Sequence, residues 1–413
     1  MVAAGAERRT ALAAGSLAAA MVLAAGWALV LTSLAWRAPA GRAGLRARLR
    51  LLPVAIAERR ALAGLDVAAG RPRAARARLA AALRRVPFSA SLWLARGEAA
   101  LQAGSRDGAR HAAAAALRRA PLDADVCYRA ALLLLQADAA GDATRALRCA
   151  VSHAPSRAGQ VYDLAHSVYG DDGLVVRTVV PDDADGARRF LVWAYGRDDP
   201  DAAAAGWDVL AGRSPSTADV VRHVDFLLAR GDVAAADAGW SAVFGPRGPG
   251  IVFDGGFESD PVGGGFGWQL GRLDGARIRI ASGEAAVEGR RGLAIEFSGG
   301  NLDFSQVGQV VPVAGGRRYA LTAMARSAGL TSLSGPRFQV EPHRSCPELR
   351  TVATRELHGT SPWTRLALEF TTPPGCGAVT VRVRRPPTTR LDRDLRGRLW
   401  IDDVRLADLG EGY

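Results

Sequence analysis

Apolar residues follow two different periods along this chain, and the period changes near residue 250. Before that point, small apolar residues recur at intervals of three and four positions, which is the spacing of one helix face. From Ile251 onwards, apolar and polar residues alternate in short runs separated by Gly and Pro, as in antiparallel strands. The pattern predicts an α+β chain with a helical first part and a β-sandwich second part, joined by the linker 246–250.

The helical part contains an internal repeat. Pro53, Pro87, Pro121 and Pro155 are spaced by 34 residues, and each ends a similar phrase, for example Leu-Arg-Arg-Val-Pro. This period predicts helix pairs that bury their apolar faces by stacking on neighbouring pairs, which gives a solenoid over residues 41–245. The residues expected at the helix contacts are Ala75, Ala109 and Ala143; Leu79, Ala113 and Leu147; and Ala82, Ala116 and Ala150.

The repeat weakens after Pro155. Residues 184–217 predict a fourth, degenerate unit, and residues 217–244 predict a last helix pair. Residues 169–185 interrupt the repeats and predict an irregular insertion. The aspartates of this insertion fit either a metal-binding loop or helix caps, and we favour the caps.

The helical part resembles the tetratricopeptide repeat. That pattern has a bulky residue, Gly or Ala four positions later, and then Ala, an apolar residue, Ala and Pro. In the second repeat, Trp93 and Gly97 take the first two places, ahead of Ala109, Ala113 and Ala116. The resemblance extends over about three units and implies a scaffold that holds protein partners.

Eight alternating runs predict the strands of the second part. They are residues 276–281, 293–297, 307–313, 319–324, 337–340, 366–370, 379–384 and 399–406. Several phrases in this part resemble the jelly-roll carbohydrate-binding modules found beside many polysaccharide hydrolases. They are Asp254-Gly-Gly-Phe257-Glu258, Gly267-Trp268, Gln309-Val310 with Pro312 and Tyr319, Trp363, and Leu399-Trp400-Ile401-Asp402-Asp403-Val404. The resemblance covers about residues 251–408 and implies a jelly-roll domain over residues 251–413.

The resemblance also implies a structural calcium ion where the first and last strands meet. Its ligands would be Glu258 and one of Asp402 and Asp403, because carboxylate oxygens suit this hard cation. In the other interpretation, these carboxylates make surface hydrogen bonds without a metal. They would also suit an acid and base pair for glycoside hydrolysis. No nucleophile elbow, phosphate-binding Gly loop or paired His spacing accompanies them, so we expect no catalytic residues and no enzyme.

Two groups of residues are candidates for glycan contact. Trp268, Trp363 and Trp400 are large enough to stack on sugar rings, although we expect Trp268 and Trp363 in the core. Arginines crowd residues 382–398 and would form either an anion-binding patch or a solvated loop between the last strands. No glycan-binding residue follows from the pattern alone.

The formal charge of +12 comes entirely from arginine, since the 53 basic residues include no lysine. We attribute this bias first to a GC-rich genome. No nucleic-acid-binding motif accompanies the charge, so we expect no nucleic-acid partner.

The first residues predict a membrane anchor. Residues 10–36 carry no charge and are long enough to span a bilayer, so we assign residues 1–40 as the anchor. The alternative is a signal peptide cleaved after Ala38-Pro39-Ala40. The arginines that follow the span favour a cytoplasmic position for the rest of the chain, whereas a disulfide between Cys346 and Cys376 would favour the periplasm. Cys127 and Cys149 fit buried thiols.

These observations predict a single-pass protein of the bacterial inner membrane with its soluble part in the periplasm. We expect it to act as a scaffold of envelope or exopolysaccharide assembly. The repeats would bind assembly proteins, and the sandwich would meet a polysaccharide or another subunit. The alternative function is that of a calcium-stabilised carbohydrate-binding module without a scaffold role.

Overall fold

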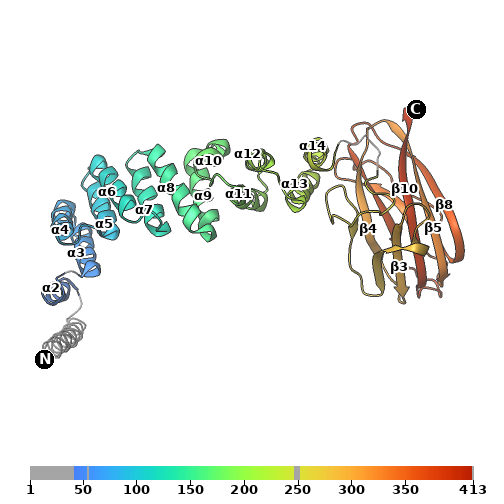
Figure 1. Cartoon of the computed structure of the whole chain (residues 1–413), viewed down its shortest axis with the longest axis horizontal. Coiled ribbons are helices and arrows are strands. Elements are labelled where there is room, and N and C mark those ends of the chain that lie inside the picture. Colours follow the sequence, from blue (N-terminus) through green and yellow to red (C-terminus); the bar gives the residue numbers. More distant parts are fainter. Residues whose placement is uncertain (1–40, 54, 246–251, 412–413) are drawn as a thin grey trace, which may run out of the picture. The chain divides into compact units, whose positions relative to one another are not determined.

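The computed structural model describes residues 41–53, 55–245 and 252–411 (Figure 1). The chain forms two compact units, the first ending at Arg213 and the second beginning at Ser214. The first unit is helical. The second contains one further helix pair and an antiparallel sandwich.

The helices of the first unit follow one another through short turns (Figure 1). They are α2 (Gly41–Leu51), α3 (Ile56–Ala68), α4 (Pro72–Arg85), α5 (Ala90–Gln102), α6 (Arg106–Arg119), α7 (Ala124–Gln136), α8 (Ala140–His153), α9 (Ala158–Tyr169), α10 (Asp172–Thr178), α11 (Ala184–Gly196) and α12 (Pro200–Ala211). Side-chain oxygens cap several helix starts: Ser89 accepts from the N–H of Leu92, and Asp123 accepts from that of Val126. The repeating helix pairs predicted from the proline spacing are present.

Small buried residues set the distance between neighbouring helices. The nine residues expected at helix contacts are at most 1% exposed. At Gly97 a methyl group would lie 2.9 Å from Leu133 Cδ1 and 3.3 Å from Ala112 Cβ, so α5 approaches its neighbours too closely for a side chain. This contact explains the glycine at the second position of the repeat pattern.

Trp93 links two consecutive repeats. Its indole N–H donates to the carbonyl of Pro87 at 3.0 Å, and the guanidinium of Arg119 lies 4.8 Å from the ring centroid. Arg119 Nε donates to the same carbonyl of Pro87 at 2.6 Å. The bulky residue and the proline of the repeat pattern are therefore joined by one arginine from the following helix.

The insertion at residues 169–185 is more regular than expected, since it contains the seven-residue helix α10. Two of its aspartates are helix caps: Asp171 accepts from the N–H of Leu174 at 2.9 Å, and Asp183 accepts from that of Gly186 at 2.6 Å. Asp172 instead contacts a histidine of α9.

The last helix pair, α13 (Thr217–Arg230) and α14 (Val233–Phe244), belongs to the same unit as the sandwich. Trp240 of α14 is fully buried, with its ring centroid 5.2 Å from that of Phe253. Asp225 Oδ1 accepts from the N–H of Gly265 at 2.7 Å. From the sequence, we expected this helix pair to belong to the repeats. We expected the domain boundary at residues 246–250, which lie outside the described residues. The aromatic face of the pair packs against residues 253–266, and the unit therefore begins at Ser214.

Two antiparallel five-stranded sheets form the sandwich (Figure 1). The strands are β1 (Gln269–Leu270), β2 (Ala276–Ser282), β3 (Arg291–Ser298), β4 (Phe304–Pro312), β5 (Arg317–Leu330), β6 (Arg337–Pro342), β7 (Val352–Ala353), β8 (Gly359–Thr371), β9 (Ala378–Arg385) and β10 (Arg396–Glu411). Sheet A has the order β1-β4-β9-β6-β7, and sheet B has the order β2-β3-β10-β5-β8. All eight predicted strands are present, and the short strands β1 and β7 were not predicted.

Alternate residues of both sheets point inward and build one apolar core. On β5, for example, Tyr319, Leu321, Ala323 and Ala325 are buried, while the residues between them are partly exposed. The predicted β-sandwich with the strand pairing of a jelly roll is present.

Two disulfide bonds cross-link the described residues. Cys346 and Cys376 are joined, as the sequence suggested. Cys127 of α7 and Cys149 of α8 are also joined, so they are not the free thiols that we expected. The structure has no free cysteine among the residues that it describes.

The predicted location needs correction. Within residues 41–53, 55–245 and 252–411, no helix combines the length and the apolar character that crossing a membrane requires. A single-pass inner-membrane protein is therefore not supported. The span expected at residues 10–36 lies outside the described residues.

Candidate functional site

The carboxylates predicted as calcium ligands hold one loop of the sandwich. Glu258 Oε1 accepts from the backbone N–H groups of Arg290 and Arg291, at 2.7 and 3.0 Å. These two N–H groups lower the pKa of Glu258. Glu258 thus fixes the loop that precedes β3.

Asp402 holds the same loop from the other side. Its carboxylate is fully buried, and Oδ2 accepts from the N–H groups of Val287 and Glu288, at 2.6 and 3.0 Å. Its Oδ1 accepts from the N–H of Asp403 at 2.7 Å, and Asp403 in turn forms an ion pair with Arg405.

These three side chains do not fit a calcium ion. Both oxygens of Asp402 already face N–H donors, which present positive charge where a cation would lie. Within the described residues, the ligand atoms of Glu258, Asp402 and Asp403 do not all lie within 4.8 Å of one another. In the described structure, backbone N–H groups hold Glu258 and Asp402, and Arg405 pairs with Asp403.

Aromatic residues are scarce on the surface of the sandwich. Trp268 lies in the main core, as do Phe304 and Tyr319. Trp363 does not lie in that core, which corrects the expectation for it. It packs with Trp400, Ala285 and Ala294 in a second, small cluster on the outer face of sheet B.

The outer face of sheet A is polar and paired. Arg382 of β9 forms an ion pair with Glu341 of β6 at 2.8 Å, and Arg337 pairs with Glu356. Arg384 pairs with Asp303. Because each of these arginines faces its own carboxylate, this face has little charge left for a ligand.

The outer face of sheet B is different. Trp400 of β10 lies under two guanidinium groups, with the Cζ of Arg326 and of Arg398 at 4.8 and 5.1 Å from its ring centroid. The carboxylate oxygens of Glu284 lie 3.9 Å from Arg326 and 3.7 Å from Arg398. The two cations therefore share one carboxylate. A second acid, Glu296 of β3, lies opposite Arg398 in the strand register.

Two more arginines extend this face along β2. Arg277 and Arg279 are exposed, and the register places Arg279 and Trp400 on either side of Ala294. Neither arginine forms an ion pair within the described part of the chain. The small side chain of Ala294 leaves a shallow hollow, which is lined by Arg277, Arg279, Glu284, Glu296, Arg398 and Trp400. We call this surface the Arg–Trp face.

Strand alternation in the sequence is a signal for the Arg–Trp face. Arg277 and Arg279 are two positions apart in a strand, so both point away from the core when Ile278 points inward. The same alternation turns Trp400 outward between Leu399 and Ile401.

The arginine run at residues 382–398 is not one basic loop. Arg382 and Arg384 lie in sheet A, and Arg398 lies on the Arg–Trp face. Arg385 is fully buried and donates to the carbonyls of Ser334, Leu302 and Arg393, at 3.1, 2.6 and 2.8 Å. Burial lowers its pKa. Arg385 therefore fastens the loops at this end of the sandwich.

The first repeats offer a second surface. A hollow of about 550 Å³ is lined by residues of α3, α4 and α5, including Ala57, Ala61, Gly64 and Ala95. Phe88 and Leu122 each follow a repeat proline and are 82% and 73% exposed. This unit thus presents both a hollow lined by small side chains and two exposed apolar residues.

Comparison with known proteins gives fold likenesses only. No family model matches the chain, and no curated protein matches it. The CBM22-1 xylan-binding domain of Paenibacillus barcinonensis Xyn10C aligns at 15% identity and a TM-score of 0.26, covering 40% of this chain and 99% of that one. The CBM22-1 and GH10 modules of Clostridium thermocellum xylanase 10B align at 16% identity and a TM-score of 0.26, covering 39% of this chain and 29% of that one.

The helical part has a match of its own. A tetratricopeptide repeat protein from Parabacteroides merdae aligns at 16% identity and a TM-score of 0.27, covering 48% of this chain and 82% of that one. By its packing, the chain combines tetratricopeptide-like helical repeats with a jelly-roll sandwich that resembles carbohydrate-binding modules.

Proposed function

We propose that this protein is a non-catalytic scaffold whose sandwich binds an acidic polysaccharide on the Arg–Trp face. Its helical repeats would hold a protein partner in envelope or exopolysaccharide assembly. The two folds support a role in carbohydrate binding or protein interaction. Beyond that role, we propose that the ligand is acidic and that the process is envelope or exopolysaccharide assembly.

The observation that carries the proposal is the incomplete pairing of arginine around Trp400. Arg326 and Arg398 share Glu284, while Arg277 and Arg279 form no ion pair within the described residues. Guanidinium groups bind carboxylates through paired, charge-assisted hydrogen bonds. The sugar ring would lie on the surface above Trp400, which is itself 3% exposed, and its carboxylate would meet the arginines of β2. A uronic acid unit offers both parts.

The test is binding of polygalacturonate to the full chain, measured by calorimetry. We expect Arg277→Ala with Arg279→Ala to weaken binding about tenfold or more. The matched control is Arg350→Ala with Arg355→Ala, which removes the same charge from exposed positions outside sheet B and should leave binding unchanged. Equal losses in both double variants would show general attraction of polyanions and would overturn the proposed site.

A neutral ligand would select the alternative function. We expect xylan and fully methyl-esterified pectin to bind at least about tenfold more weakly than polygalacturonate, because they lack the carboxylate. Tight binding of a neutral glycan, unchanged in the Arg277 and Arg279 variants, would instead indicate a carbohydrate-binding module of a different specificity.

The absence of catalysis is also part of the proposal. The carboxylates of Glu258 and Asp402 accept hydrogen bonds from backbone N–H groups of one loop, which supports a structural role for both residues. We expect no turnover of the bound polysaccharide by the wild-type chain. Cleavage that Glu258→Gln abolishes, with the fold retained, would show a hydrolase.

The partner would bind the hollow between α3 and α5. A photo-crosslinker replacing Ala61 or Ala95 should capture the same polysaccharide-assembly protein, since both residues line the hollow. The same crosslinker at Arg84, an exposed residue of α4 that does not line the hollow, is the control. Equal capture from all three positions would contradict a specific surface.

A further inference from the structure

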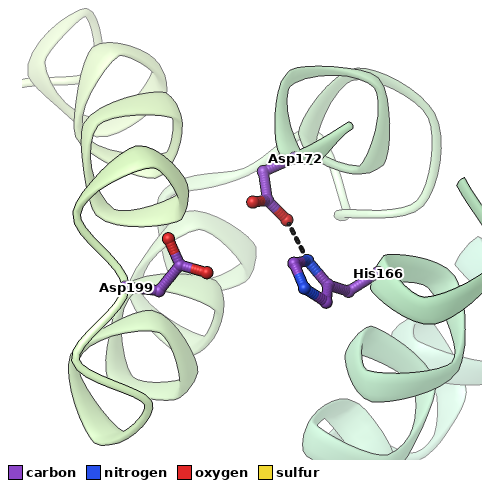
Figure 2. Close-up of side chains that lie close together, drawn as sticks. All are labelled: His166, Asp172 and Asp199. Carbon is purple, nitrogen blue, oxygen red and sulfur yellow. Dashed lines mark hydrogen bonds and ion pairs between the residues drawn. The ribbon is translucent and has the colours of Figure 1, made fainter. Parts of the chain in front are cut away.

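Three side chains of the first unit gather around the insertion. His166 lies in the last turn of α9, Asp172 is the first residue of α10, and Asp199 is the N-cap of α12. One ligand atom from each lies within 4.8 Å of the other two, and Figure 2 shows the three groups turned toward one another. They come from three separate helices, so their meeting depends on the tertiary fold and not on local sequence.

Hydrogen bonds involve only some of the polar atoms of these three side chains. His166 Nδ1 lies 2.9 Å from Asp172 Oδ1, and Asp199 Oδ1 accepts from the N–H of Ala202 at 3.1 Å (Figure 2). Within the described residues, the second oxygen of Asp172 and that of Asp199 make no hydrogen bond. The Asp172 side chain is only 11% exposed, so water satisfies it poorly.

The charges of this group favour a divalent cation. The carboxylates of Asp172 and Asp199 lie close to each other and to the imidazole of His166. A doubly charged ion would neutralise both. One nitrogen and two oxygens form a donor set that Zn²⁺ accepts, with bonds of about 2.0 to 2.2 Å and a fourth position for water. A tetrahedral ion needs ligand atoms about 3.4 Å apart, and these atoms all lie within 4.8 Å of one another, so side-chain rotation can supply the difference.

We propose that His166, Asp172 and Asp199 bind one Zn²⁺ ion that ties the inserted helix α10 to α9 and α12. The insertion breaks the 34-residue period, and α10 has only seven residues, too few for a helix to be stable alone. A metal tie would hold the insertion where regular repeat packing is interrupted. This proposal is independent of glycan binding by the sandwich.

The test is zinc binding to the full chain after treatment with a chelator. We expect one Zn²⁺ per chain with micromolar or tighter affinity, and a rise in the melting temperature of the helical transition. Asp199→Asn retains a helix-capping side chain but lowers the ligand charge, and it should weaken binding about tenfold or more. Asp183→Asn is the matched control, since Asp183 caps the neighbouring helix α11 and is not part of the group.

Cobalt substitution gives a second readout. Co²⁺ at this site should produce the visible absorption of a four-coordinate ion, and His166→Ala should abolish it. The proposal is overturned if the wild-type chain binds no zinc at micromolar concentration, or if Asp199→Asn and His166→Ala bind it as the wild type does. Stronger binding of Ca²⁺ than of Zn²⁺ would also overturn it, because the nitrogen ligand would then be unused.

Discussion

The helical repeats and the outer face of sheet B use arginine in opposite ways. In the repeats, arginine reaches across to the backbone of a neighbouring helix: Arg110 donates to the carbonyl of Ala137 at 2.9 Å, and Arg148 donates to that of Thr178 at 3.0 Å. On the Arg–Trp face, Arg277 and Arg279 extend into solvent. An arginine whose donors are already satisfied stabilises the fold, whereas one with free donors is available to a ligand.

Two tryptophans show the same contrast. Trp93 lies beside Arg119, but Arg119 also donates to the carbonyl of Pro87 and is held in place. Trp400 lies beside Arg326 and Arg398, which share the nearby carboxylate of Glu284. The amino-acid composition does not distinguish these arginines. Only their contacts show which ones have a structural role and which ones are available for binding.

The largest expected effect comes from Arg385, a buried sandwich arginine that donates to backbone carbonyls as those of the repeats do. Arg385→Met leaves the carbonyls of Ser334, Leu302 and Arg393 without their donor, and we expect a loss of about 3 to 5 kcal/mol in the stability of the sandwich. Hydrogen exchange of peptides from β9 and the following loop measures this loss. Arg390→Met, at an exposed position in the same loop, should change stability by less than about 0.5 kcal/mol. Equal effects of the two changes would contradict the fastening role.

The next effect depends on pH and concerns the helix pair α13 and α14. Burial lowers the pKa of His223 to about 4, below its ordinary value of 6.5. The unfolded chain takes up a proton as the pH falls through 6.5, whereas the folded chain does so only near pH 4. Stability is therefore fully present above pH 6.5 and is lost between pH 6.5 and 4, by up to about 3 kcal/mol.

Urea unfolding of the second unit across this pH range measures the effect. We expect His223→Gln to flatten the pH dependence relative to the wild type. His358→Gln, at an exposed position, should leave it unchanged. A wild-type slope that survives in His223→Gln would assign the pH dependence to other groups.

A smaller effect tests the close packing of the repeats. Gly97→Leu forces a side chain against Leu133 and Ala112, and we expect a loss of about 1 to 3 kcal/mol from overpacking. Gly64→Leu makes the same change in α3, where no atom lies within 4 Å of the added Cβ, and helix propensity should raise stability by about 0.5 kcal/mol. Thermal unfolding of the first unit compares the two. An increase in stability in both variants would show that packing does not require a glycine at position 97.

The smallest expected effect is that of calcium on the sandwich. Because Asp402 and Glu258 accept from backbone N–H groups, millimolar Ca²⁺ or EGTA should shift its melting temperature by less than about 1 °C. Calorimetry of the full chain checks this. A shift of several degrees that Asp402→Asn removes would show that these carboxylates bind the ion after all.

The regular parts of the fold were predictable because they depend on local periodicity. The prolines and small residues of the repeats fix which helix faces meet, and the alternation of 276–281 or 379–384 fixes which residues point inward. The pairing of α13 and α14 with the sandwich was not predictable, because Trp240 and Phe266 are brought together only by tertiary packing. The sequence showed amphipathic helices there but not the surface that they cover.

The sites were less predictable than the fold for the same reason. The resemblance implied that Glu258 and Asp402 or Asp403 lie where the first and last strands meet. The partners of Glu258 and Asp402 are backbone N–H groups, which no side-chain pattern reveals. His166, Asp172 and Asp199 belong to three helices, and their meeting depends on how the insertion folds. Arg277 and Trp400 were predictable as outward-facing residues, yet their place on one face depends on the strand order of sheet B.

The most direct test of the central claim is arginine labelling with phenylglyoxal, read by mass spectrometry, with and without polygalacturonate. We predict that the ligand protects Arg277, Arg279 and Arg398 on the Arg–Trp face and leaves the labelling of Arg350 and Arg355 unchanged. Protection of Arg350 and Arg355 to the same degree, or no protection of Arg277 and Arg279 at saturating ligand, would contradict the assignment of the Arg–Trp face as the polysaccharide site.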